Sequence, residues 1–145
     1  MQVILEQCHL PAQGAVKLNM QREFVIQVTA EEAQRKVSRW LWDEVSMLIS
    51  ADPPTLVIGE QVVWRVPTWI GFPSQGRAGN VGAVDVDVQT GELYDLAAAR
   101  KKIEACATTI AQKLPPFQPR PVPQEWLVEH TLFTPVHENA QEKSK

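Results

Sequence analysis

Two carboxylates at alternate positions of one extended segment are the first candidates for chemistry in this chain. Asp85 and Asp87 lie in the alternating run at residues 84–88, and residues two apart on a strand project from the same face. Paired carboxylates can share a proton or bind a divalent cation. A calcium loop would need glycine at its sixth position and an acid at its twelfth, where this chain has Thr90 and Leu96. We therefore favour two solvated acids on an exposed strand face, and a carboxylate-based hydrolase ranks third among the functions.

The other reactive side chains lack the neighbours that their chemistry requires. Cys8 and the histidines show no spacing typical of two metal ligands on one element. Ser74 lies in PSQG rather than in the strained GxSxG turn of a nucleophile. The glycines that follow it do not open a helix, as a dinucleotide site requires. The sequence thus predicts no metal, no cofactor and no catalytic activity. The histidines are His9, His130 and His137.

Two groups of cationic side chains fall on the predicted helices. If both helices lie on one side of a sheet, the groups could merge into a patch that binds phosphates. Acids stand close to each group in sequence, which favours ordinary solvated helix faces. The net charge of −3 provides no broad cationic field and disfavours nucleic acid as a partner. The groups are Arg35, Lys36 and Arg39, and Arg100, Lys101 and Lys102.

Five tryptophans suggest contact surfaces. Trp40 and Trp64 fall on faces predicted to be core, whereas Trp42 and Trp69 fall on the opposite faces, and Trp126 lies in the C-terminal region. Large aromatic side chains that point outward mark protein contact sites, because they contribute much interface energy. The alternative is that the C-terminal segment folds back and covers Trp69 or Trp42 within the same chain.

The elements that hold these residues alternate between strands and amphipathic helices. Thr29 and Glu32 form a capping box that starts the first helix, which we expect to end at residues 50–54. Asp95 is the expected N-cap of the second helix, which two prolines end at residues 115–116. We expect strands at residues 1–10, 24–28, 55–58, 62–72 and 84–88. The order predicts an α+β fold: a small antiparallel sheet with two amphipathic helices packed on one face, plus a Pro-rich C-terminal arm.

Two further expectations concern the long central strand. Its Pro67 cannot donate a ladder hydrogen bond, which predicts a sheet edge or a bulge at that point. An edge strand of this kind is also a candidate seam for a homo-oligomer. The glycine-containing residues 73–82 that follow are expected to form a long hairpin loop.

Length and composition predict one folded domain with an extension. The 145 residues, 44% of them hydrophobic, suffice for a single packed core. We expect an α+β domain at residues 1–114, a Pro-rich arm with an apolar docking segment at 115–137, and a disordered tail at 138–145. The run PPFQPRPVP within the arm is typical of polyproline II.

Localisation is predicted from what the sequence lacks. The N-terminal residues have neither a basic region nor a long apolar stretch, so we expect no signal peptide and no membrane association. Two cysteines are too few for a disulfide framework in a secreted domain. A cytoplasmic protein is the expectation.

Two motifs resemble those of PepSY units, in which a T-x-E-E-A helix start precedes a hairpin that runs into V-D-x-x-T-G-E. Residues 29–33 match the first motif and residues 86–92 match the second, so the resemblance covers roughly residues 29–94. An inhibitory or binding role is proposed for that family, and for this chain the resemblance implies a non-enzymatic fold. The pattern W-R-V-P followed by V-D-x-x-T-G-E is also similar to short bacterial proteins of unassigned function.

These observations rank three functions. The first is a non-enzymatic interaction or regulatory subunit that binds a protein partner through its C-terminal arm, with Trp69 as a second contact. The alternative is a regulator that binds nucleic acid or a small ligand through the basic helix faces, and the third is the carboxylate-based hydrolase. The docking residues of the arm are Trp126, Leu127, Leu132 and Phe133.

Overall fold

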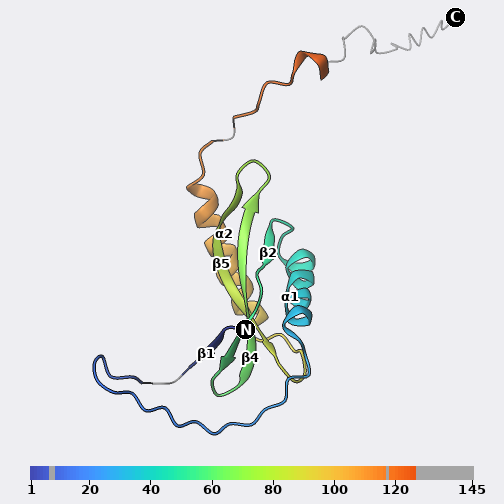
Figure 1. Ribbon diagram of the computed structural model, residues 1–145. Helices are drawn as coiled ribbons and strands as arrows, with labels where there is room; N and C mark the ends of the chain where they lie inside the picture. Colours follow the sequence, from blue (N-terminus) through green and yellow to red (C-terminus); the bar gives the residue numbers. More distant parts are fainter. Residues whose placement is uncertain (7–8, 117, 127–145) are drawn as a thin grey trace, which may run out of the picture. The chain divides into compact units, whose positions relative to one another are not determined.

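Two α-helices and a five-stranded mixed sheet form an α+β fold in the first part of the chain (Figure 1). The computed structural model describes residues 1–6, 9–116 and 118–126. The chain divides into two units, Met1–Leu114 and Pro115–Lys145, and the sheet belongs to the first. Within the described ranges, no helix is long and apolar enough to cross a lipid bilayer.

The sheet is built around one long hairpin, β4–β5. Along one side β4 pairs antiparallel with β5, and along the other it pairs with β3 through its first half and with β2 through its second. β1 pairs with β3 in parallel, so the expectation of a purely antiparallel sheet is wrong. The parallel pair is possible because a helix and a strand intervene between β1 and β3 and provide the long crossover. The strands are β1 (Val3–Leu5), β2 (Ile49–Ala51), β3 (Thr55–Ile58), β4 (Val62–Phe72) and β5 (Gly76–Asp87).

Alternate residues of β4 and β5 form the apolar face of the sheet. Trp64 and Val66 on β4 stand opposite Val86 and Val84 on β5, and all four are at most 2% exposed. The valines of the alternating run at residues 84–88 therefore face the core, on the side opposite to Asp85 and Asp87. The indole N–H of Trp64 is also satisfied, since it donates to the Val28 carbonyl at 2.8 Å.

The first helix, α1 (Ala30–Glu44), begins at the predicted capping box. The Thr29 hydroxyl accepts from the Glu32 amide at 3.2 Å, and the Glu32 carboxylate accepts from the Thr29 amide at 2.8 Å. The hydrogen bonds to Thr29 hold the pKa of Glu32 below its usual range. α1 ends earlier than expected, because the apolar residues that follow pair with β4 as strand β2. Its fully buried residues are Ala33, Val37 and Leu41.

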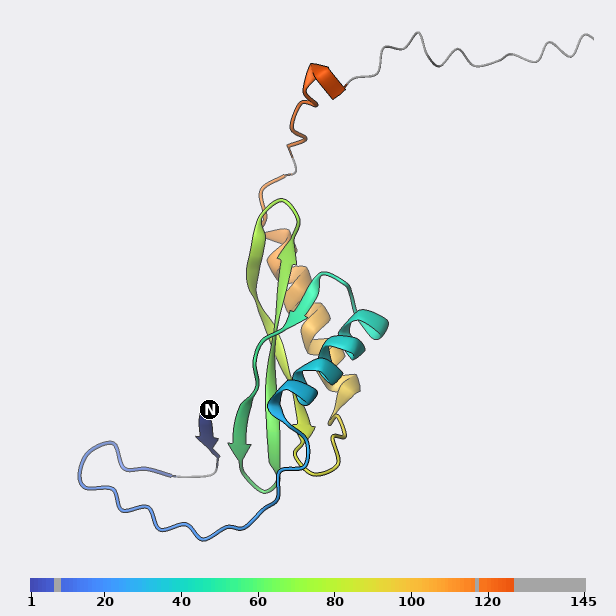
Figure 2. The same ribbon diagram turned by 45° about the vertical axis from the view of Figure 1, so that its right-hand side comes forward.

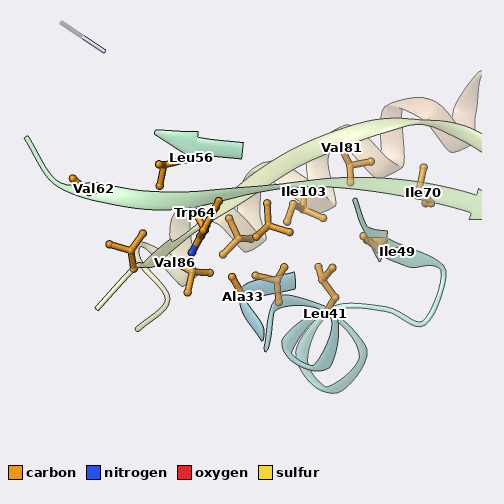
Figure 3. Close-up of a cluster of buried hydrophobic side chains, with 14 residues drawn as sticks. Ala33, Leu41, Ile49, Leu56, Val62, Trp64, Ile70, Val81, Val86 and Ile103 are labelled. Carbon is orange, nitrogen blue, oxygen red and sulfur yellow. The ribbon is translucent and has the colours of Figure 1, made fainter. Parts of the chain in front are cut away.

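The second helix, α2 (Leu96–Gln112), begins where it was predicted but without the predicted cap. Asp95 stands at the N-cap position with a left-handed φ of 49°, and its side chain makes no capping hydrogen bond. Ile103 of α2 is fully buried and joins the same apolar cluster as the inner residues of α1. Figure 2 shows both helices on one side of the hairpin, and Figure 3 shows Ala33 and Leu41 of α1 and Ile103 of α2 in one cluster of buried side chains.

The loop expected at residues 73–82 is mostly strand, since β5 begins at Gly76. Glycines usually weaken strands, but here two of them give α2 room to approach. A Cβ on Gly79 would lie 3.1 Å from Cδ1 of Ile110, and one on Gly82 would lie 3.2 Å from Cγ1 of Ile103. Gly79 and Gly82 are therefore contact points between strand and helix rather than parts of a flexible loop.

Of the two alternatives predicted for Pro67, the sheet edge is wrong, whereas the hairpin register does shift close by, just after Thr68. β4 has strands on both sides, and the proline falls where its neighbours change from β2 to β3. The Pro67 carbonyl accepts from the Asp52 amide at 2.8 Å at this crossing. A seam between two copies would therefore have to use β1, β2 or β5.

The strand predicted at residues 24–28 does not form. The amides of Gln27 and Val28 both donate to the carbonyl of Val88 at 2.9 Å. Both amides thus share one backbone acceptor, and the segment makes no ladder despite its β-branched composition. Val25 and Ile26 remain 58% and 41% exposed, which shows that strand propensity without a pairing partner is insufficient.

Candidate functional site

Asp85, the first of the two catalytic candidates, is held by an arginine on the neighbouring strand. Nε and Nη2 of Arg65 donate to the two Asp85 oxygens at 2.9 and 3.0 Å, and Nη1 donates to Glu6 at 2.7 Å. The hydrogen bonds that Arg65 donates to Asp85 raise the pKa of Arg65. This bidentate pair joins β4 to β5, and Glu6 follows β1, so the cluster fastens three parts of the sheet together.

Asp87, the second candidate, braces the turn that follows its strand. One oxygen accepts from the amides of Gln89 and Thr90 at 2.7 and 2.9 Å, and the other accepts from the Tyr94 hydroxyl at 2.6 Å. The Tyr94 hydrogen bond, followed by those of the amides, lowers the pKa of Asp87. The same bond raises the pKa of Tyr94 to about 12.

The two aspartates therefore share a face, as alternation predicted, but they have different hydrogen-bond partners. Both are half-buried rather than simply solvated. Sequence reasoning missed Arg65 and Tyr94. A turn in which an aspartate accepts from amides two and three residues ahead is a known Asx pattern, so the role of Asp87 could have been found. The partner of Asp85 depends on strand register, which gave no local signal.

The described part of the chain contains no group of three or more histidine, cysteine or acidic side chains that could hold a metal ion. His9 is exposed, and Cys106 is a half-buried free thiol on α2. The remaining candidates, Cys8, His130 and His137, lie outside the described residues.

A groove with a volume of about 820 Å³ runs between α1 and the start of α2. We call it the α1–α2 groove. Its apolar wall combines one residue before α1, one on α1 and two around the start of α2. These residues are Val28, Trp40, Leu93 and Leu96. Figure 2 shows the two helices between which it lies.

Charged side chains line the rim of the α1–α2 groove, and some of them are already engaged. Lys36 donates to the Gly91 carbonyl at 3.1 Å, and Glu44 lies 3.9 Å from Arg100. Within the described residues, Arg35 and Arg39 have neither a hydrogen bond nor an ion pair through their side chains. The charged lining residues are Glu32, Arg35, Lys36, Arg39, Asp43 and Glu44.

The two predicted basic groups therefore do not form one patch. The group on α1 lines the groove, whereas Arg100 on α2 is paired with Glu104 at 2.9 Å as well as with Glu44. Lys101 and Lys102 are exposed and do not line the groove. Only the α1 group combines cationic side chains with an apolar surface.

The positions of the tryptophans agree only in part with the expected division between core and surface. Trp64 is buried, and Trp40 is half-buried in the groove wall, whereas Trp42 is 63% exposed. Trp69 is half-buried, and the Arg77 guanidinium lies 4.9 Å from its ring centroid. Two hydrogen bonds to Asp52, at 3.1 and 2.6 Å, hold that arginine in place. One surface of the Trp69 ring is thus already in contact with its own domain.

The described part of the C-terminal arm is exposed throughout. Residues 115–116 and 118–126 are all exposed, and Trp126 has 76% of its surface accessible. A short 3₁₀ helix, η1 (Gln124–Trp126), ends this part, and the Trp126 amide donates to the Pro123 carbonyl at 2.9 Å. The other proposed docking residues, Leu127, Leu132 and Phe133, and the tail at 138–145 lie outside the described residues.

Comparisons with protein-family models, with curated proteins and with solved structures found no match. The two motifs that carry the resemblance to PepSY units do form as a helix cap and as a turn. Both are local structural devices, so membership of that family stays a prediction.

Proposed function

We propose that the protein is a non-enzymatic interaction subunit that binds a protein partner through its C-terminal arm. The observation that carries the proposal is Trp126, which is 76% exposed next to a proline-rich segment whose described residues are all exposed. Tryptophan is enriched among the residues that dominate binding energy. A polyproline segment is already extended, so it loses little conformational entropy when it binds.

The two aspartates support the non-enzymatic part of the proposal. Asp85 accepts hydrogen bonds from Arg65, and Asp87 accepts them from the amides of the following turn and from the Tyr94 hydroxyl. A hydrolase would need at least one of these carboxylates free to exchange a proton with a substrate or an attacking water. Both carboxylates instead accept hydrogen bonds from the protein on the sheet face turned away from the helices.

The partner surface is expected to suit the chemistry of the arm. Proline-rich ligands bind to grooves lined by aromatic side chains, and Trp126 would fill an apolar pocket beside such a groove. Leu127, Leu132 and Phe133 extend the apolar part of the docking segment. Trp69 remains the proposed second contact, although Arg77 leaves only part of its ring available.

Affinity capture from the native cell lysate, read by mass spectrometry, tests the proposal. We expect one stoichiometric partner with the full chain, and we expect its loss when the chain is truncated after Leu114 or carries Trp126→Ala. Trp42→Ala is the matched control, since it removes another exposed tryptophan, from α1. Retention of the partner by the truncated chain would contradict the proposed role of the arm.

A further inference from the structure

The α1–α2 groove has no part in the proposed binding by the arm, although its size and lining are those of a ligand site. Its volume of about 820 Å³ lies within the range of roughly 300–1,000 Å³ that is typical of sites for small molecules. The half-buried Trp40, Leu93 and Leu96 all line this space. An apolar body of modest size would therefore find apolar contacts from α1 and from the start of α2.

The cationic side chains of the groove include two that have no acceptor among the described residues. Arg35 and Arg39 are four residues apart on α1, so their side chains lie on the same side of the helix. Lys36 differs, because it donates to the Gly91 carbonyl at 3.1 Å. A free guanidinium presents paired N–H donors that match the two oxygens of a carboxylate.

The acids of the rim do not occupy these donors in the described structure. Glu32 accepts from the Thr29 amide in the capping box, and Glu44 lies near Arg100 at the other end of the groove. Asp43 is one turn beyond Arg39 but makes no ion pair with it in the described residues. Leu96, the first residue of α2, also lies in the wall, so the positive end of that helix dipole favours an anion nearby.

We propose that the α1–α2 groove binds a small amphipathic carboxylate. The apolar body of the ligand packs between Trp40 and the pair Leu93 and Leu96. Its carboxylate accepts hydrogen bonds from Arg39 and Arg35 at the rim. All residues that line this site belong to the unit Met1–Leu114, so a ligand and a protein partner can be tested separately.

Octanoate is the first probe, with 1-octanol as its neutral counterpart and octylammonium as its cationic one. Binding to the ¹⁵N-labelled full chain is followed by the tryptophan indole N–H signals in NMR spectra, with Trp40 assigned from the Trp40→Phe variant. We expect octanoate to shift the Trp40 signal in a saturable way and to leave the Trp42 signal in place. We expect octanol to bind more weakly and octylammonium to bind least.

A charge-matched pair of double variants tests the role of the arginines. Arg35→Gln with Arg39→Gln should weaken octanoate binding by about tenfold or more, because charge-assisted hydrogen bonds are lost. The same variant should remove the preference for octanoate over octanol. Lys101→Gln with Lys102→Gln removes two positive charges outside the groove and should leave the affinity unchanged, as should Trp126→Ala.

Three results would overturn the proposal. One is the absence of a saturable Trp40 shift below the concentration at which octanoate forms micelles. The second is equal loss of affinity in the arginine and lysine variants, which would indicate general charge attraction. The third is equal binding of octanoate and octanol by the unmodified chain, which would indicate an apolar surface without recognition of an anion.

Discussion

β4 and β5 turn one set of side chains toward the helices and the alternate set away from them, and the two sets are stabilised by different interactions. Trp64 stands opposite Val86 beneath the helices, and at the next position Arg65 stands opposite Asp85 on the other face. Trp64 is 2% exposed, whereas the Arg65 side chain keeps 35% of its surface in contact with solvent.

This difference teaches that neighbouring residues of one strand can contribute to stability on different scales. On the covered face, stabilisation grows with the apolar area removed from water. On the open face, protein hydrogen bonds replace hydrogen bonds to water, so the net gain of each is small. The face, rather than the strand, should therefore decide what a substitution costs.

The largest expected effect is on the covered face. Trp64→Ala should lower the free energy of unfolding by about 3–5 kcal/mol, because it leaves a large cavity in the core and removes the donor to the Val28 carbonyl. Urea unfolding followed by circular dichroism measures the change. Trp42→Ala, at an exposed position on α1, should change the free energy by less than about 0.5 kcal/mol. Equal losses in the two variants would break the comparison.

The next effect concerns the ion pair on the open face. Arg65→Met and Asp85→Asn, alone and together, form a double-mutant cycle with an expected coupling energy of about 1 kcal/mol. The value is modest because about a third of each side chain is exposed. Urea unfolding of the four proteins gives the coupling. A coupling energy as large as the loss from Trp64→Ala would show that both faces contribute on the same scale.

A smaller effect on the open face is expected from the titration of Asp87 and Tyr94. Tyr94 is the chain's one tyrosine, so tyrosinate absorbance reports on it alone, and we expect a pKa of about 12. Asp87→Asn removes the charged acceptor and should return this pKa toward 10. An unchanged pKa in that variant would mean that Asp87 does not hold the hydroxyl.

The same pair predicts two limits to its stabilising contribution. The pKa of Tyr94 is raised in the folded state, so its contribution is complete below pH 10 and is lost as pH rises from about 10 through about 12. The pKa of Asp87 is lowered, so its contribution is complete above its usual pKa and is lost as pH falls through the folded-state value. Urea unfolding across pH, compared between the unmodified chain and Asp87→Asn, measures both limits.

The smallest effect is expected from a polar group on the covered face. Thr68 is fully buried, and its hydroxyl has no hydrogen-bond partner in the described structure. Thr68→Val keeps the shape and removes the unsatisfied group, so the free energy of unfolding should stay unchanged or rise by up to about 1 kcal/mol. A loss of more than about 1 kcal/mol in urea unfolding would mean that the hydroxyl has a partner, such as a buried water.

Features that depend on nearby residues could be predicted from the sequence. The capping box of Thr29 and Glu32 and the alternation of the valines at residues 84–88 follow from periodicity and short-range hydrogen bonding. The start of α2 was also predictable. These features set where the two helices begin and which face of β5 is buried.

The missed features depend on residues far apart in the sequence. The glycines of β5 suggested a loop, because the sequence does not show that Ile103 and Ile110 of α2 approach the backbone at Gly82 and Gly79. The pairing of Arg65 with Asp85 requires the strand register. The groove was missed for the same reason: the basic residues of α1 were identified, but its second wall comes from residues 93–96, fifty or more positions later.

The parallel pairing of β1 with β3 has a consequence for the order of folding. Val3 pairs with Leu56, so more than fifty residues of chain must be closed into a loop before this contact forms, and contacts of large sequence separation form late. The hairpin β4–β5 needs only a short turn and can form first. Amides that bond across the β1–β3 junction, such as those of Glu6 and Leu56, should therefore exchange with solvent hydrogen well before those of the hairpin.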